Sequence, residues 1–117
     1  MVRSLKFREL ARRSYEEGSH DFASFFAQQA VEFYVKGLLI RRIGAKVYSH
    51  SLVVLIDTLA ESGVSVPSSV RDCIERLGEH YIQARYPDAR MTDYSQSEAR
   101  EALRCMEVTL DFLATVG

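Results

Sequence analysis

The chain has 117 residues, of which 47% are hydrophobic, and its formal net charge is −1 at pH 7. This length predicts a single domain over residues 1–117, and the hydrophobic fraction is sufficient for a core without disulfides. The near-zero charge excludes a general electrostatic attraction to nucleic acid, so any such contact needs a local basic cluster.

The first helical pattern lies near the N-terminus and ends at Gly18. Its apolar face repeats at intervals of three and four residues and comprises Phe7, Leu10, Ala11, Ser14 and Tyr15. A glycine commonly follows a helix because it adopts left-handed backbone angles. Ser19 or Asp21 is then available to cap the next helix.

The second helix, expected from about residue 21 to 43 with Gly44 past its end, is apolar on nearly every side. One side carries Phe22, Phe25, Phe26, Phe33 and Ile40, and the other carries Ala23, Ala27, Ala30, Tyr34 and Leu38. Its polar strip consists only of Ser24, Gln28, Glu32 and Arg42. Such a helix is usually buried on several sides, and so short a chain covers only part of it. We therefore predict a homodimer.

Three further amphipathic helices follow. Ser49 to Ser51 supply capping hydroxyls for the third helix, and Pro67 opens the fourth because proline fits the first helical turn. Pro87 ends the fourth helix near residues 85–86, and Ser95 with Glu98 forms a capping box for the fifth. The inward faces comprise Leu52, Leu55, Ile56, Leu59 and Ala60; Val70, Cys73, Ile74, Leu77, Tyr81 and Ala84; and Ala99, Ala102, Leu103, Met106, Leu110 and Leu113. Short connections between long helices predict an all-α, five-helix up-and-down bundle.

The two cysteines and the N-terminus indicate the compartment. Cys73 and Cys105 fall on apolar helical faces, so we expect two buried thiols rather than a disulfide or a metal site. No cluster of cysteine, histidine and carboxylate has ligand spacing, so we expect no metal and no cofactor. Sparse cysteines, a charged N-terminus without a signal-peptide core and apolar runs too short for a bilayer predict a cytoplasmic protein without a membrane contact.

The usual catalytic signatures are absent, but two polar groups near the second helix stand out. Gln29 and Lys36 are two turns apart on one side of that helix. Either Lys36 extends its ammonium to solvent while Gln29 bonds to a neighbouring helix, or both line a polar pocket or a dimer interface. His50 lies between two serines, where it serves either loop polarity and capping or hydrogen bonding in a pocket.

A third polar group, residues 80–88, lies at the end of the fourth helix. It combines a histidine, two tyrosines, an arginine and an aspartate. Arginine suits phosphate, and tyrosine rings stack on bases. Alternatively, Arg85 bonds the last helix carbonyls and pairs with Asp88, while Pro87 ends the helix. On spacing alone, these two interpretations are equally supported.

Four blocks of sequence, in this order and spacing, resemble the HEPN family, whose name stands for higher eukaryotes and prokaryotes nucleotide-binding. The blocks are FFAQQAVEFYVK at 25–36, SHSL at 49–52, YIQARYPD at 81–88 and YSQSEA at 94–99. The resemblance implies a five-helix bundle that commonly forms a homodimer. It also implies that the gene often lies beside that of a small nucleotidyltransferase, with which many members form toxin–antitoxin pairs. Other members are nucleases that cut RNA without metal through an arginine and a histidine with four to six residues between them, and the fold is similar to the substrate-binding helical domain of aminoglycoside nucleotidyltransferases.

This sequence departs from the nuclease pattern. Its formal match, Arg13 with His20, crosses the first turn instead of lying late in the bundle. Arg76 has only three residues between it and His80, and Arg85 follows His80, which is the wrong order. Metal-free RNA cleavage needs an acid or base near a cation, and His80 with Arg85 supplies both types without matching the motif.

We therefore predict a protein that binds a nucleotide or acts as the partner of a small nucleotidyltransferase. The residues predicted to bind the ligand are Lys36, His50, Arg85, Tyr86 and Asp88. The first alternative is a metal-independent endoribonuclease toxin that acts on RNA, with His80 and Arg85 as the catalytic candidates. The second alternative is a non-catalytic interaction module in which the polar residues serve structure alone.

Overall fold

The computed structural model describes residues 2–85 and 95–116, with side chains described for 3–79 and 95–116. All regular secondary structure in this part of the chain is helical, which confirms the all-α prediction. The helices are α1 (Val2–Glu16), α2 (His20–Ile43), α3 (Leu52–Glu61), α4 (Ser68–Arg85) and α5 (Gln96–Leu113).

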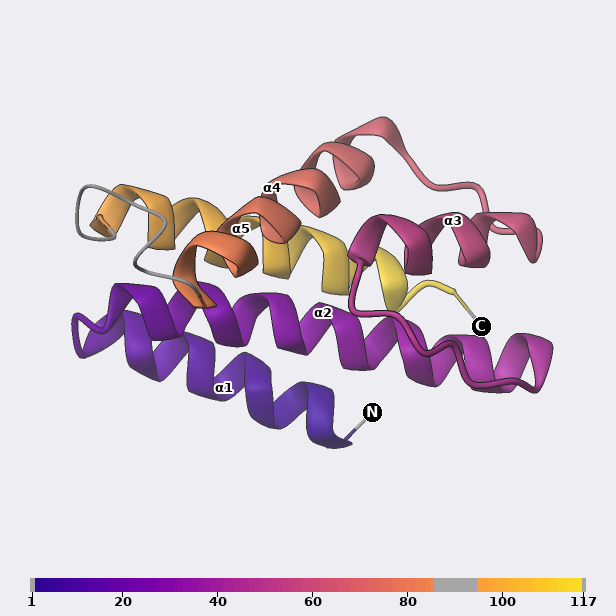
Figure 1. Cartoon of the computed structure of the whole chain (residues 1–117), viewed down its shortest axis with the longest axis horizontal. Helices are drawn as coiled ribbons and strands as arrows, with labels where there is room; N and C mark the ends of the chain where they lie inside the picture. Colours follow the sequence, from indigo (N-terminus) through magenta and orange to yellow (C-terminus); the bar gives the residue numbers. More distant parts are fainter. Residues whose placement is uncertain (1, 86–94, 117) are drawn as a thin grey trace.

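The long helices α1, α2, α4 and α5 alternate in direction along the molecule, and α3 is a short helix in the connection between α2 and α4 (Figure 1). The 24-residue α2 is central, because it contacts each of the other four helices. The molecule measures 40 × 25 × 24 Å, and its long dimension is close to the ~36 Å length of a 24-residue helix. The described helices include none that is long and apolar enough to cross a membrane.

The core follows the apolar faces predicted from the sequence. It is built mainly from α2, α3, α4 and α5, and its largest fully buried hydrophobic side chains are Leu38, Leu39, Leu52, Leu55, Ile56, Leu59, Ile74, Leu77, Met106 and Leu113. Leu10 is an exception, because 38% of it is exposed although its spacing placed it inward. The reason is that α1 packs on the bundle through small buried residues, with Ala11 in the core and Ser4 Oγ donating to the carbonyl of Ala30 at 2.7 Å.

Most helix ends also follow the sequence signals. Gly44 ends α2 with a left-handed φ of 68°, and its N–H donates to the carbonyl of Ile40. Ser51 caps α3, and Ser95 with Glu98 forms the expected capping box on α5. At the start of α2, however, the Ser19 side chain makes no capping bond; instead, the N–H of Phe22 donates to Asp21 Oδ1 at 2.9 Å.

Cys73 and Cys105 are joined in a disulfide, so the prediction of two free thiols is wrong. Both side chains are buried, as expected. The helices α4 and α5 pack against each other with both apolar faces inward, and this brings the two Cα atoms to 4.9 Å, within the range that a disulfide needs. Because the two residues are 32 positions apart on different helices, their spacing does not indicate this contact.

Candidate functional site

Three of the four residues in the polar strip of α2 lie inside the molecule, and the fourth, Arg42, is exposed. Ser24, Gln28 and Glu32 are spaced four residues apart, so they share one side of the helix, and each is at most 1% exposed. The carbonyl and the ring of His50, in the segment between α2 and α3, both contact this side. A buried carboxylate is costly unless hydrogen bonds and opposite charge satisfy it.

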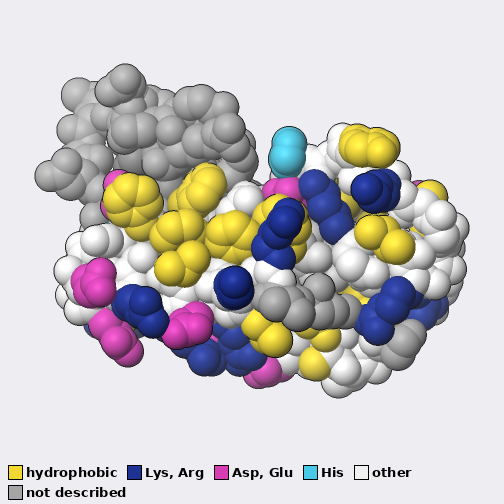
Figure 2. Space-filling model, turned by 90° about the horizontal axis from the view of Figure 1, so that it is seen from below, with side chains coloured by type: hydrophobic (Ala, Val, Ile, Leu, Met, Phe, Trp, Pro, Cys, Tyr) yellow, Lys and Arg dark blue, Asp and Glu magenta, His cyan; other side chains and the backbone are white. Residues whose placement is uncertain are grey.

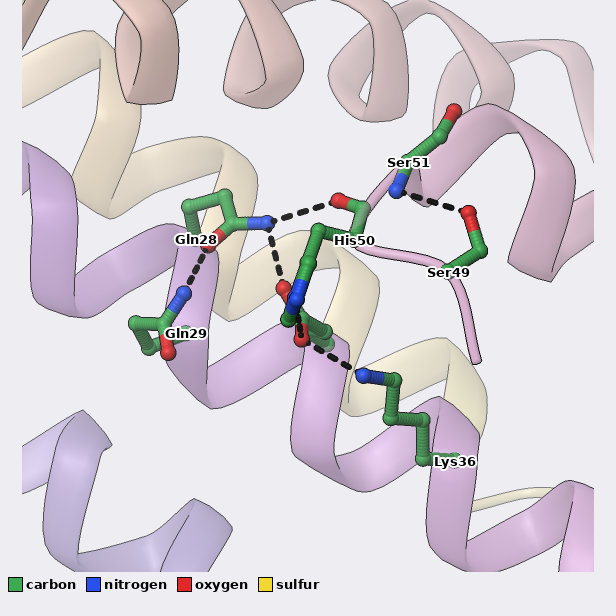
Figure 3. A network of polar contacts seen from close by, with 7 residues as sticks. Gln28, Gln29, Lys36, Ser49, His50 and Ser51 are labelled. Atoms are coloured by element: carbon green, nitrogen blue, oxygen red, sulfur yellow. Dashed lines mark hydrogen bonds and ion pairs between the residues drawn. The ribbon is translucent and has the colours of Figure 1, made fainter. Parts of the chain in front are cut away.

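Glu32 meets that requirement on both of its oxygens. Its Oε2 accepts from Lys36 Nζ at 2.8 Å and lies 2.9 Å from His50 Nδ1, while its Oε1 accepts from Gln28 Nε2 at 3.0 Å. Figure 3 shows Gln28, His50 and Lys36 converging from two turns of α2 and from the segment that precedes α3. One buried carboxylate therefore fixes an ammonium and an imidazole beside each other.

The charge state of Glu32 fixes the tautomer of His50. Burial pushes the pKa of Glu32 up, but hydrogen bonds from Lys36, Gln28 and His50 outweigh it and hold this pKa below its ordinary value. A carboxylate only accepts, so Nδ1 of His50 carries the proton in this contact, and in the neutral ring the lone pair is on Nε2. The side chain of His50 is 75% exposed, so this lone pair is open to solvent.

A cavity of about 380 Å³ adjoins this network, and Lys36 belongs to both. The cavity is lined by Phe33, Lys36, Gly37 and Ile40 of α2, by Arg3 of α1, and by Lys46, Val47 and Tyr48 after α2. Figure 2 shows one face of the molecule, where yellow hydrophobic side chains run along the middle and dark blue cations stand among them in the right half.

Three cations and two aromatic rings border the cavity. The Arg3 guanidinium lies 5.3 Å from the centroid of the Phe33 ring, and Lys46 is exposed. Tyr48 is 91% exposed, so its ring is free for stacking. The described lining contains no carboxylate, so the cavity is electropositive. Such a site suits an anion that carries a planar ring.

Of the residues predicted to bind a ligand, Lys36 and His50 come together, because both contact Oε2 of Glu32. The side chains of the others, Arg85, Tyr86 and Asp88, and that of His80, lie outside the described residues. The described part of α4 extends to Arg85, and the helix end predicted from Pro87 lies outside the described residues.

Gln29 does not line the cavity together with Lys36, as one interpretation of the sequence proposed. Its Nε2 donates to Gln28 Oε1 at 2.5 Å on its own helix, and it is not among the residues that line the cavity. The Lys36 ammonium is bound to Glu32. The two residues of the formal nuclease match each contact another side chain: Arg13 pairs with Glu9 at 2.8 Å, and the His20 ring lies beside that of Tyr15.

Sequence reasoning did not single out Glu32, Arg3, Lys46 or Tyr48. A signal for Glu32 exists, because a carboxylate with polar residues four positions before and after it is unusual in so apolar a helix. No such signal exists for the other three, since their proximity depends on how α1 and the segment after α2 pack. Among the described residues, no three histidine, cysteine or acidic side chains form a metal-binding group.

Comparison with known proteins gives a consistent result. Residues 1–116 match the family model described as HEPN domain. The fold is similar to the crystal structure of TT1696 from Thermus thermophilus, with 34% identity, a TM-score of 0.70 and coverage of 97% of this chain and 98% of that chain. It is also similar to ST0689, described as an archaeal HEPN homologue, with 24% identity, a TM-score of 0.71 and coverage of 97% and 90%, a likeness of fold alone. No protein of curated function matches the chain significantly.

Proposed function

The chain belongs to the HEPN domain family, and on this premise we propose that it binds a nucleotide whose phosphates lie between Arg3, Lys36 and Lys46. The observation that carries this proposal is the convergence of three cations on one cavity. Arginine and lysine form strong charge-assisted hydrogen bonds with phosphate. The exposed ring of Tyr48 at the same cavity offers a stacking surface for the base.

The geometry of Lys36 supports the same assignment. Its ammonium has three N–H donors, and its contact with Glu32 uses one of them, which leaves two for a ligand. The contact also fixes the position of an otherwise flexible side chain, so less rotamer freedom is lost on binding. The cavity volume of about 380 Å³ lies within the range of ~300–1,000 Å³ typical of small-molecule sites.

Calorimetric titration of ATP, ADP and AMP tests this proposal. Arg3→Ala and Lys46→Ala are expected to weaken binding roughly tenfold or more each, because a charge-assisted bond contributes about 1.5–3 kcal/mol. Lys6→Ala is the matched control, since Lys6 is also an exposed cation of α1 but does not line the cavity. Parent protein that binds none of the three nucleotides, or equal weakening by the control, would contradict the proposal.

We also propose that the protein is a cytoplasmic homodimer that acts with a small nucleotidyltransferase as a toxin–antitoxin pair. Membership of the family supports the partner, and the exposed hydrophobic residues of α2 support the dimer. If a small nucleotidyltransferase is encoded beside the gene, co-expression of the two proteins is expected to give a stable complex in gel filtration and to relieve growth arrest. Separate elution of the two proteins, with growth unaffected by either, would argue against this role.

One observation favours a second candidate function, a metal-independent endoribonuclease. His50 presents Nε2 to solvent while Glu32 holds Nδ1, which is the arrangement of an oriented general base. If RNA is cut in the presence of a chelator, His50→Ala is expected to abolish cleavage. Loss of cleavage in His80→Ala but not in His50→Ala would move the catalytic assignment to residues 80–88, and intact RNA would exclude this function.

A further inference from the structure

A stripe of hydrophobic side chains runs along the outer side of α2. Its members, which recur mostly at helical spacing, are Phe22, Phe25, Phe26, Phe33, Ile40 and Ile43. Phe22 is 57% exposed, Ile40 46% and Ile43 44%, whereas the core residues are nearly all below 5%. The middle of the stripe is half-buried, because the Phe7 ring of α1 stacks on those of Phe26 and Phe33, so its exposed apolar surface lies mainly at the two ends. Exposed apolar side chains of this size mark a contact with another macromolecule. We refer to these six residues as the α2 stripe.

The two ends of the α2 stripe carry opposite charge. Exposed acidic residues, namely Glu16, Glu17 and Asp21, flank its N-terminal end, and exposed basic residues, namely Arg41 and Lys46, flank its C-terminal end. In Figure 2 dark blue side chains predominate at the right end of this face, whereas magenta ones stand at the left end, with dark blue ones beside them along the lower edge. A surface that is acidic at one end and basic at the other is complementary to a reversed copy of itself.

The two ends also differ in shape. At the N-terminal end the rings of Phe22 and Phe26 stack, with centroids 6.2 Å apart, and Phe22 projects into solvent. At the C-terminal end the surface is hollowed by the cation-lined cavity, where Gly37 offers no side chain and Ile40 is half-exposed. The stripe therefore has an aromatic ridge in one half and a hollow in the other.

The residues of the α2 stripe are spaced almost symmetrically about Phe33. Phe26 and Ile40 each lie seven residues from Phe33, and the exposed ends of the stripe, Phe22 and Ile43, lie eleven and ten residues from it. We propose that a second copy of this chain docks on the α2 stripe with its α2 antiparallel, about a two-fold axis near Phe33. This pairing rests on the homodimer proposed above and specifies its interface. It places Asp21 of each copy beside Lys46 of the other.

In this pairing, residues of both copies line each ligand cavity. The aromatic ridge of one copy lies over the cavity of the other and supplies the wall that a single copy lacks. Within one chain, Phe22 is fourteen residues from Lys36, or about 21 Å along the helix, so it does not reach its own cavity. Any effect of Phe22 on ligand binding therefore comes from the second copy.

A charge swap tests the pairing by sedimentation equilibrium. Asp21→Lys and Lys46→Asp each place like charges at both ends of the interface, so each is expected to weaken dimerisation about tenfold or more. The double variant restores opposite charges and is expected to return to within a few-fold of the parent. Asp72→Lys is the matched control, because Asp72 is an exposed acid on α4, grouped with Glu75, Arg76 and Glu79 of the same helix, and its change should leave the dimer unaffected.

Each failure has a distinct meaning. A monomeric parent at micromolar concentration would overturn both the homodimer and this pairing. A dimeric parent whose dissociation constant does not respond to either single change, or whose weakened single variants are not restored by the double change, would overturn the pairing alone.

As a second readout, Phe22→Ala is expected to weaken nucleotide binding several-fold; unchanged binding would contradict the shared cavity. A parent that binds no nucleotide would remove the proposed ligand, while the charge swap would still decide the pairing.

Discussion

At the scale of single residues, Glu32 organises the candidate site. Its carboxylate is 1% exposed and holds Lys36 and His50 on the same oxygen. Lys36 thereby keeps a fixed position at the cavity, and His50 keeps a fixed tautomer. Because the carboxylate is buried and also carries these contacts, the residue serves both the site and the stability of the fold.

Replacing Glu32 by glutamine is expected to destabilise the protein by about 3 kcal/mol, because it leaves the largely buried Lys36 ammonium without its counter-charge. Urea denaturation measures the change in the free energy of unfolding. Glu61→Gln is the control, since an exposed glutamate usually changes stability by no more than ~0.5 kcal/mol. Equal small effects in both variants would show that the Glu32–Lys36 pair does not stabilise the fold.

The same carboxylate makes stability depend on pH. The pKa of Glu32 is lowered in the folded state, and that of Glu107 is lowered by hydrogen bonding to Arg8. Each carboxylate therefore adds stability above its unfolded pKa of about 4.3, and loses it as the pH falls through the lower folded pKa. Urea midpoints from pH 7 to pH 3 should decline in acid, and less steeply for Glu32→Gln. Parallel curves would contradict a lowered pKa for Glu32.

At the scale of helices, the sequence predicted the elements and most of their faces. Periodicity identified five helices, and residues such as Gly44 and Ser95 marked their ends correctly. Periodicity fixes which residues share a face, but it does not say which element covers that face. For this reason the burial of Gln28 and Glu32 and the exposure of Leu10 became clear only from the packing.

The capping box of α5 gives a prediction at this scale. Ser95→Ala removes the hydroxyl that accepts from the N–H of Glu98, and this is expected to cost about 1 kcal/mol of stability. Ser69→Ala, an exposed serine in the first turn of α4, provides a control expected to have little effect. Thermal melting of the two variants compares them directly. A loss for Ser95→Ala no larger than that for Ser69→Ala would mean that the capping box contributes little.

At the scale of the whole molecule, the candidate site joins segments that are distant in sequence. Arg3 comes from the first helix, Lys36 from the second, and Tyr48 from the connection to the third. Helix periodicity carries no information on such contacts, because they depend on how the helices pack. This explains why the sequence placed Lys36 and His50 in one predicted ligand site but indicated neither the carboxylate that they share nor the cavity.

The disulfide is also a property of the assembled molecule. It closes a loop of 32 residues between α4 and α5, so reduction is expected to lower stability by about 2–4 kcal/mol. Urea denaturation with and without a thiol reductant measures this difference, and Cys73→Ala with Cys105→Ala provides a variant that should not respond to the reductant. Equal stability of the oxidised and reduced parent would contradict a stabilising role.

The central claim is that the cation-lined cavity, completed by its Glu32 network, binds nucleotide phosphate. The most direct measurement is a titration of the ¹⁵N-labelled protein with ATP, followed by the amide resonances in two-dimensional NMR spectra. The largest shifts are expected in residues 3, 32–40 and 46–50, the segments that line the cavity or form the Glu32 network. Shifts concentrated instead in residues 80–88, or no shifts at millimolar ATP, would contradict the claim.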